Sequence, residues 1–446
     1  MEALTITPNN NTSCTTTTNP TTSPWMDSRI WSRLPQSLID RIISCLAPPA
    51  FFRARTVCKR WYALIFANSF LDLHHQVSPP RHWFLFFKQQ NPHKNYMSYR
   101  YINNPTNSTV HRYYEGYLFD PLELKWYRLS FPLIPHGYYP ATSSGGLICW
   151  VSEEAGSKSI LLGNPLLIQI GSTYNSGLIQ LPSTLRPRLC PCIGLAITDS
   201  CIDLVFAGDD MISLYAVKNL SSESFHIDGG GFYSIWGTTA SLPRLCSLES
   251  AGRMVHVEGR FYCMNYSPFS VLSYEIMGMN KQWCEIQAPM RRFLRSPSLV
   301  ESGGKLLLVA AVEKSKLNVP KSLRMWGLQT GTGVWVEIER MPQQLYVEFA
   351  EIEGGRGFDC IAHGDFVAII IKKGRGASSS DHRRKKALLY EFGRKRWLWM
   401  PPCPAIHHGV NDNDDDHELL GFAYQPKVAV PIAALLHQLT PPFLQS

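Results

Sequence analysis

The chain has 446 residues, enough for two or three domains, and 45% of them are hydrophobic, which suits a protein with a large core. The formal net charge is +8, but only 17% of residues are charged, so charge alone does not indicate nucleic-acid binding. The 12 cysteines are scattered through apolar, strand-like contexts, which favours free thiols over a disulfide framework. Without a secretory signal or an apolar run long enough to span a bilayer, we expect a soluble cytosolic or nuclear protein with no membrane partner.

Residues 1–24 are rich in Thr, Asn, Ser and Pro and hold too few apolar side chains to form a core, which predicts a disordered tail. The next segment, residues 25–75, has helical spacing instead. Its apolar residues repeat every three or four positions and therefore share one helical face: Leu38, Ile39, Ile42, Ile43 and Leu46.

Pro48-Pro49 predicts a break after this first helix. A second apolar face is expected where Val57, Trp61 and Ile65 recur at helical spacing, with Leu64 beside them. A unit of roughly 40 residues rarely buries enough apolar area to be stable alone. Part of its apolar surface is therefore expected to contact another chain.

The order of these residues resembles an F-box, which has a Leu-Pro pair, an Ile/Leu-rich helix, a proline-containing break and the string Val-Cys-Lys-x-Trp. The resemblance implies that the segment docks onto a Skp-type adaptor bound to a cullin, while the downstream domain recruits a substrate for ubiquitylation. The alternative is an ordinary helical hairpin within a larger domain. The residues that the resemblance assigns to the adaptor are Leu34, Pro35, Ile39, Ile43, Leu46, Val57, Cys58 and Trp61.

Residues 76–446 have a different sequence pattern, in which short aromatic and aliphatic runs are divided by Gly, Pro, Asn and Asp. Examples are residues 83–87, 202–207 and 366–371. Such runs predict strands separated by turns. The expected fold class is therefore α+β multidomain, with a short all-α domain followed by an all-β domain.

A phrase recurs within this second domain: an apolar strand, a polar turn and a strand that carries a tryptophan. Its clear copies hold Trp126, Trp283, Trp335 and Trp397, and the last three are spaced by 52 and 62 positions. A period near 50 resembles kelch repeats, each of which forms a four-stranded blade of a β-propeller. We therefore predict that the four tryptophans occupy equivalent positions, one in each blade.

The interval from Trp126 to Trp283 is about three repeat periods long. Degenerate copies of the phrase, near residues 161–165 and 214–227, fill this interval. This spacing predicts about six blades and leaves seven open. The tail from Leu419 is expected to close the ring by pairing with the first blade.

The arrangement can be narrowed further, because several strings resemble the Unusual Floral Organs/Fimbriata family of flowering plants. The resemblance implies a nuclear protein, with the cytoplasm as a further compartment, that acts in SCF-type ubiquitin ligases. It also implies a co-regulator of a LEAFY-type transcription factor in floral meristem and organ identity; a purely non-proteolytic co-regulator is the alternative. The strings are residues 25–31, 48–53, 216–226, 261–269, 288–299 and 312–321.

No residue constellation predicts catalysis, so we expect a non-catalytic adaptor subunit without cofactor or metal. Asp209-Asp210 and the acidic run 414–416 lie in turn-like contexts, where solvated loops are the better interpretation. His407-His408 near that run is a weaker candidate for metal binding.

Two basic clusters stand out, one at residues 290–325 and one at 372–396. The second contains Arg383-Arg384-Lys385-Lys386, an importin-read signal or a solvated loop. The chain has no helix-turn-helix, zinc-finger or basic-zipper pattern, so we expect contacts to DNA phosphates within a ternary complex instead of base reading. The candidates for partner or DNA-backbone contact are Arg291, Arg292, Arg295, Lys314, Lys316 and Lys321.

Overall fold

The computed structural model describes residues 33–90, 115–131, 134–168, 178–198, 201–211, 220–228, 236–243, 246–267, 269–276, 282–290, 293–313, 321–329, 331–372, 387–404 and 417–428. The tail predicted for residues 1–24 lies outside these ranges. Among the helices within them, none is both long and apolar enough to cross a bilayer.

The first part of the chain is helical, as the sequence predicts. Pro35 precedes the first helix, and Pro48 and Pro49 form the first turn of the second, where a missing N–H costs nothing. Cys58 caps the third helix, and its Sγ accepts a hydrogen bond from the Trp61 backbone N–H at 3.5 Å. The elements are α2 (Gln36–Ser44), α3 (Pro48–Arg55), α4 (Lys59–Ala63), the 3-10 turn η1 (Leu64–Phe66) and α5 (Asn68–Val77).

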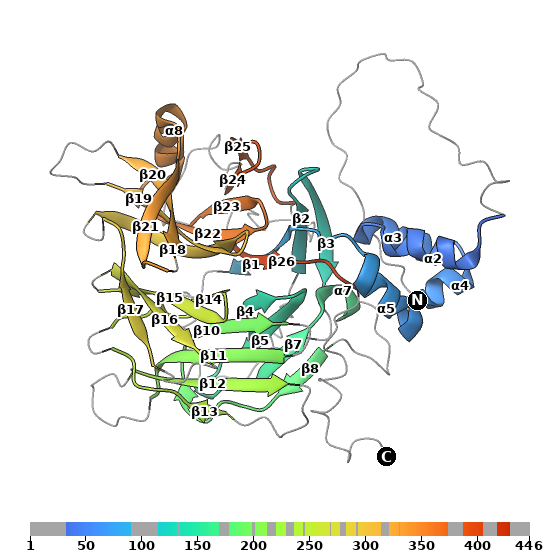
Figure 1. The fold of residues 1–446 in the computed structure, drawn as a ribbon, viewed down its shortest axis with the longest axis horizontal. Helices are drawn as coiled ribbons and strands as arrows, with labels where there is room; N and C mark the ends of the chain where they lie inside the picture. Colours follow the sequence, from blue (N-terminus) through green and yellow to red (C-terminus); the bar gives the residue numbers. More distant parts are fainter. Residues whose placement is uncertain are drawn as a thin grey trace, which may run out of the picture.

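The rest of the described chain is a six-bladed β-propeller of four-stranded antiparallel sheets (Figure 1). This settles the blade count left open by the sequence. In chain order the strands are β1 (Trp83–Gln90), β2 (Glu115–Asp120), β3 (Lys125–Ser130), β4 (Tyr138–Ser144), β5 (Leu147–Ser152), β6 (Gly156–Ser157), β7 (Ile160–Gly163), β8 (Leu178–Leu181), β9 (Pro187–Arg188), β10 (Cys192–Ile197), β11 (Cys201–Asp209), β12 (Leu220–Asp228), β13 (Gly237–Thr238), β14 (Val255–Val257), β15 (Arg260–Tyr266), β16 (Phe269–Glu275), β17 (Cys284–Gln287), β18 (Leu294–Ser302), β19 (Lys305–Val312), β20 (Ser322–Gln329), β21 (Val334–Arg340), β22 (Phe358–His363), β23 (Phe366–Ile371), β24 (Ala387–Glu391), β25 (Arg396–Trp399) and β26 (His417–Tyr424).

From the inner to the outer strand, the blades are β26-β1-β2-β3, β4-β5-β7-β8, β10 to β13, β14 to β17, β18 to β21 and β22 to β25. Two helices interrupt them, α7 (Pro165–Ile168) and α8 (Gln343–Glu353), and β6 pairs with β9 outside the blades. Each inner strand contacts the inner strands of the two neighbouring blades, so the ring is closed.

The first blade takes its inner strand from the end of the chain. Residues Trp83 to Gln90 of β1 pair with Tyr424 to His417 of β26 in one unbroken antiparallel register. The prediction that the tail from Leu419 closes the ring is therefore confirmed. The ring cannot form until residues more than 300 positions apart have met.

The recurring tryptophans lie where the outer strand of a blade begins, and their equivalence is confirmed. Trp126, Trp335 and Trp397 are the second residues of β3, β21 and β25, and Trp283 directly precedes β17. Trp236, which directly precedes β13, is the tryptophan of the degenerate copy predicted near residues 214–227, and the sequence pattern did not identify it.

Four of these indole rings also tie neighbouring blades together. Their Nε1–H groups donate to Pro401 O at 3.0 Å (Trp126), Pro182 O at 2.9 Å (Trp236), Ser222 Oγ at 2.8 Å (Trp283) and Gln287 O at 2.9 Å (Trp335). Each acceptor belongs to the preceding blade or to the connection that leaves it. The tryptophan of the repeat thus has a physical function, because it packs on its own blade and bonds to the one before.

A single arginine occupies the middle of the ring. Arg253, which precedes the inner strand β14, donates to the Gly421 carbonyl oxygen of β26 and pairs with Asp359 of β22. Its guanidinium also lies over the Phe422 ring, 5.1 Å from the centroid. Because β14 does not neighbour either strand in the ring, this side chain crosses the centre of the propeller and links three blades.

We predict that Trp283→Ala destabilises the propeller most among the tryptophan variants. Trp283 is 8% exposed, whereas Trp126, Trp335 and Trp397 are half-buried. Removing a buried indole should cost about 3–5 kcal/mol, and the half-buried ones should cost less. Urea unfolding of the four alanine variants measures this order; equal losses at all four positions would contradict it.

Candidate docking surface on the helical domain

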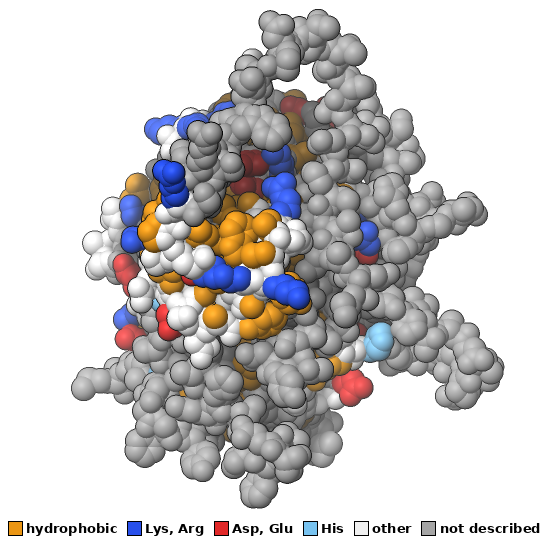
Figure 2. All heavy atoms as spheres, turned by 90° about the vertical axis from the view of Figure 1, so that its right-hand side faces the viewer, with side chains coloured by type: hydrophobic (Ala, Val, Ile, Leu, Met, Phe, Trp, Pro, Cys, Tyr) orange, Lys and Arg blue, Asp and Glu red, His pale blue; other side chains and the backbone are white. Residues whose placement is uncertain are grey.

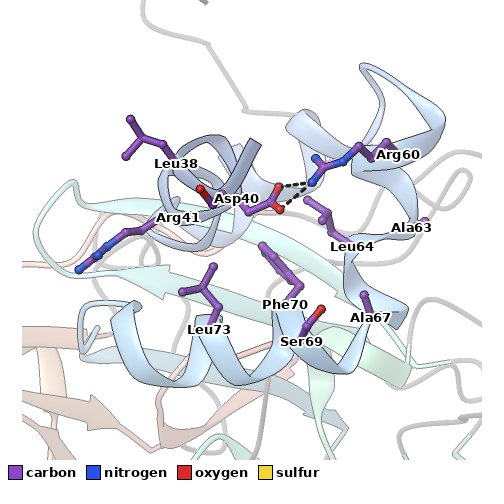
Figure 3. Close-up of a pocket in the computed structure, with 11 residues that line it drawn as sticks. Leu38, Asp40, Arg41, Arg60, Ala63, Leu64, Ala67, Ser69, Phe70 and Leu73 are labelled. Atoms are coloured by element: carbon purple, nitrogen blue, oxygen red, sulfur yellow. Dashed lines mark hydrogen bonds and ion pairs between the residues drawn. The ribbon is translucent and has the colours of Figure 1, made fainter. Parts of the chain in front are cut away.

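An open groove of about 620 Å³ lies between α2, α4, η1 and α5 (Figure 3). Leu64 and Phe70 form its apolar floor, and Leu38 stands at its rim. Asp40 of α2 and Arg60 of α4 meet across one end, with their nearest nitrogen and oxygen 2.6 Å apart. This ion pair links α2 to α4 beside the open groove.

Beside the groove, the helical domain exposes an unusual number of large apolar side chains. The exposed fractions are 42% for Leu38, 36% for Ile42, 67% for Val57, 56% for Tyr62 and 48% for Phe66. Figure 2 shows hydrophobic side chains gathered on this side of the molecule, with Lys and Arg at their edge. A patch of this kind on a short helical unit marks a protein-docking surface.

One buried arginine orders part of that patch. The Arg55 guanidinium donates to the Tyr62 carbonyl oxygen from Nε at 3.2 Å and from Nη2 at 3.0 Å. It also lies 4.7 Å from the Tyr62 ring centroid and 5.7 Å from that of Phe66. Burial lowers the pKa of Arg55 from its ordinary value, but these contacts keep the aromatic pair in place at the surface.

The residues assigned to the adaptor differ in how far they are exposed to solvent. Pro35, Val57 and Cys58 are exposed, and Leu34, Ile39, Leu46 and Trp61 are half-buried. Ile43 is only 2% exposed and belongs to the core of the helical domain with Phe51, Leu64 and Phe70. Its direct contact with an adaptor is therefore not supported, and its contribution is to hold α2 in place.

Val57 also departs from the expected helical face. It lies in the turn between α3 and α4, because the helical run ends at Arg55 and restarts at Lys59 with Cys58 as its cap. The exposed members of α2, Leu38 and Ile42, were visible in the sequence spacing but were not assigned to the adaptor. Their exposure shows that part of the apolar stripe of α2 is not buried in the core of the helical domain.

The helical domain is packed firmly against the first two blades. Ala47 and Phe52 join the core cluster that contains Trp83 of β1 and Leu166 of α7, while Val428, just after β26, enters the core of the helical domain. Figure 1 shows these helices at one end of the propeller, beside β3 and α7.

Polar contacts reinforce the same junction. Arg81 Nη2 donates to the Cys45 carbonyl oxygen at 2.7 Å, and Asn164 Nδ2 donates to that of Lys427 at 2.7 Å. The docking surface thus has a fixed position relative to the blades.

The basic candidates fall into two groups. Arg291, Arg292, Lys314 and Lys316 lie outside the described residues. Lys321 is described and exposed, directly before β20.

Arg295 does not present a free guanidinium, contrary to its assignment. Its Nη1 and Nη2 donate to the Glu353 carboxylate at 2.6 and 2.9 Å, and its Nε pairs with Glu313. Burial alone would raise the pKa of Glu353, but the Arg295 hydrogen bonds and the Gly357 and Gly355 backbone N–H groups lower it below its ordinary value. Arg295 therefore clamps α8 to blade five.

Similarity to known proteins agrees with this geometry. Residues 31–71 match the F-box-like family model. The chain is 58% identical to Protein UNUSUAL FLORAL ORGANS of Arabidopsis thaliana, over 94% of this chain and 90% of that protein. The chain belongs to the UNUSUAL FLORAL ORGANS family of F-box proteins. It is also 38% identical to Protein ABERRANT PANICLE ORGANIZATION 1 of Oryza sativa subsp. japonica, with 93% of each chain covered. An F-box/kelch-repeat protein of Arabidopsis thaliana is 24% identical over 90% of both chains.

We predict that Leu38→Glu combined with Ile42→Glu weakens binding to a Skp-type adaptor at least 100-fold, because charges replace two exposed apolar side chains of the patch. Leu34→Ala with Pro35→Ala should likewise abolish pull-down. The matched control is Val347→Glu, which places a charge on an even more exposed apolar site, in α8. Biolayer interferometry with purified adaptor measures the affinities; a double variant that binds like the control would contradict the assignment.

We predict that Arg295→Ala lowers the stability of the propeller by about 3–5 kcal/mol, because it leaves the Glu353 carboxylate, 1% exposed, without its partner. Denaturant unfolding measures the loss. Arg295→Ala with Glu353→Gln should recover part of it, and a single variant as stable as the wild type would contradict the clamp.

We predict a loss of stability in mild acid from His74, which is 3% exposed at the junction of the two domains. Burial, with smaller effects from Lys427, His75 and Arg81, lowers the pKa of His74 to about 4. The unfolded chain, with a pKa near 6.5, binds the proton first, so this contribution is intact above pH 6.5 and declines as the pH falls toward 4.

Between pH 7 and pH 5 the wild type should lose about 2 kcal/mol more than His74→Gln. The comparison must be made with this variant, because burial also lowers the pKa of His363 to about 4. Identical pH profiles for the two proteins would contradict the prediction.

Proposed function

We propose that this protein is the substrate-recruiting subunit of an SCF-type ubiquitin ligase and also a co-regulator of a LEAFY-type transcription factor in floral meristem and organ identity. The observation that carries the ligase function is the exposed apolar patch of the F-box, which is held on a closed propeller. In such a complex the Skp-type adaptor covers the patch and binds a cullin. Other subunits then catalyse the ubiquitylation, and this chain positions the substrate.

The position of the F-box supports a two-ended arrangement. The F-box joins the propeller at the start of β1, the end of blade one where β26 finishes. In blades five and six, β19 and β23 end, and β20 and β24 begin, at the opposite end of the propeller. An adaptor on the F-box therefore leaves those strand ends open to another partner.

The co-regulator function rests on family membership and on the distribution of basic residues. Lys321 is exposed at the start of β20, and in the sequence the basic stretches at 314–316 and 383–386 precede β20 and β24, outside the described residues. Lysine and arginine there would add phosphate contacts beside a site held by the transcription factor. A nuclear location, with the cytoplasm as a further compartment, follows from this proposal.

A purely non-proteolytic co-regulator is the alternative, and the F-box patch separates the two. Leu38→Glu with Ile42→Glu removes adaptor binding without deleting the domain on which Val428 packs. If ubiquitylation is required, this variant fails to activate a LEAFY-dependent promoter in plant protoplasts, whereas Val347→Glu succeeds. Full activation by the double variant, with adaptor binding lost, would favour the alternative.

We predict that reversing Arg291, Arg292, Lys314, Lys316 and Lys321 to Glu weakens the ternary complex with DNA and the LEAFY-type factor. The salt dependence of binding should flatten as well, by about 0.9 in the log–log slope for each lost phosphate contact. Arg295 is left intact because it is a structural residue. The control reverses Lys125, the exposed first residue of β3, and Lys395, which is exposed in the turn before β25, both at the F-box end. Gel shifts decide: an unchanged complex and slope would show that the basic residues are only solvated.

A further inference from the structure

Blade three carries a cluster of three different metal-binding side chains. Cys201 and Asp203 are two residues apart on β11, so both side chains are on the same face of the sheet. His226 of β12 is directly opposite Asp203 in the register of the two strands. Two residues from one strand and a third across the ladder therefore meet on one face, an arrangement that lets a rigid sheet present three ligands to one ion.

The donor atoms of this cluster are close together. One atom each from Cys201, Asp203 and His226 forms a set in which every pair lies within 4.8 Å. Cys201 Sγ is 3.8 Å from Asp203 Oδ2, and His226 Nδ1 is 2.5 Å from Asp203 Oδ1. Ligands of a tetrahedral zinc ion lie roughly 3.3–3.6 Å apart. The His226 and Asp203 donor atoms, at 2.5 Å, must therefore move apart by side-chain rotation when an ion binds.

The surroundings favour a bound cation over a set of independent surface groups. The Asp203 and His226 side chains are 14% and 28% exposed, and Cys201 is half-buried, so the cluster is partly shielded from solvent. Thr198 Oγ1 is 3.0 Å from Cys201 Sγ and can donate a hydrogen bond to a thiolate.

The chemistry of the donor set selects the ion. A thiolate, an imidazole and a carboxylate together suit zinc, whereas calcium and magnesium prefer oxygen ligands alone. Zinc also needs no redox partner and accepts four-coordinate geometry, so three protein ligands leave one position for water or for a group from a partner.

The cluster lies at the end of the propeller that carries the F-box. β10 ends and β11 begins beside it, and the Ile197 backbone N–H donates to Ser144 Oγ at 3.1 Å, which aligns this end of blade three with blade two. Blade two in turn contacts the chain just after β26, since the space beside Gly146 is filled by the Gln425 carbonyl oxygen. The cluster and the F-box are therefore on the same end, with the cluster in the blade next to the two on which the F-box packs.

We propose that Cys201, Asp203 and His226 form a binding site for one Zn²⁺ ion. The ion replaces the thiol proton of Cys201 and the hydrogen bond between His226 and Asp203, and it links the start of β11 to the end of β12 in blade three. None of its three ligands is among the residues assigned to the adaptor or to DNA.

The test uses the full-length protein purified with its adaptor, stripped with a chelator and then reloaded with Zn²⁺ or Co²⁺. We expect one ion per chain after gel filtration, measured by elemental analysis, and a thiolate-to-cobalt charge-transfer band in the Co²⁺ protein. Cys201→Ser should abolish that band, and Cys201→Ser and His226→Gln should each lower Zn²⁺ affinity at least about 10-fold in competition with a chromophoric chelator. Far-UV circular dichroism confirms that the variants are folded.

Cys284→Ser is the matched control, because Cys284 is an exposed thiol on β17 outside the cluster. It should keep both the cobalt band and the Zn²⁺ affinity. Less than one ion per chain in the wild type would overturn the proposal and leave the three side chains as a hydrogen-bonded group. A Zn²⁺ affinity that is the same in wild type, Cys201→Ser and His226→Gln would also overturn it, because the ion would then be bound elsewhere.

Discussion

The pairing of β26 with β1 is the interaction on which the rest of the structure depends. It supplies the inner strand of blade one, and the five side chains from Trp83 to Phe87 are each at most 3% exposed as a result. Burying an aromatic or aliphatic side chain contributes about 1.5–3 kcal/mol, so this one strand is a large part of the stability of the ring. The outer tryptophans and Arg253 also join blades, and Trp126 bonds to the chain that leaves blade six, but the β1–β26 pairing joins the two ends of the propeller over eight residue pairs.

The same two strands also connect the ring to the F-box. The chain reaches β1 directly from α5, and it leaves β26 toward Val428, which packs in the F-box core. Closure of the ring and packing of the F-box on the propeller therefore depend on the same two strands. A flexible linker would let the propeller sample many orientations, whereas this junction fixes the direction in which a recruited partner faces the rest of a ligase.

The sequence predicted the features that depend on local pattern. The F-box order, the strand texture and the closure at Leu419 follow from spacing and turn residues, and each appears in the structure. The sequence predicted only a degenerate copy near residues 214–227 and did not identify Trp236 as its tryptophan, because the strand Leu220–Asp228 alternates polar residues and lacks the apolar run of the other copies. Long-range contacts could not be predicted from the sequence either. The sequence pattern indicates that Arg295 is a surface cation, whereas in the folded chain it pairs with Glu353.

The F-box shows the same limit in another form. Helical spacing identified the apolar stripe of α2 but could not divide it into a buried part, Ile43, and an exposed part, Leu38 and Ile42. That division depends on α5, which packs against α2 from a later part of the sequence. The candidate zinc cluster was invisible for the same reason, because Cys201 and His226 meet only through strand pairing.

The most direct test of this account is the rigidity of the junction between F-box and propeller. Spin labels carried by unnatural amino acids at Thr56 and Thr332, both exposed, would report the distance between the F-box and blade five by pulsed electron paramagnetic resonance. The account predicts a single narrow distance distribution in the adaptor-bound protein, which broadens in Phe52→Ala with Val428→Ala. A broad distribution in the wild type, unchanged by these substitutions, would contradict it.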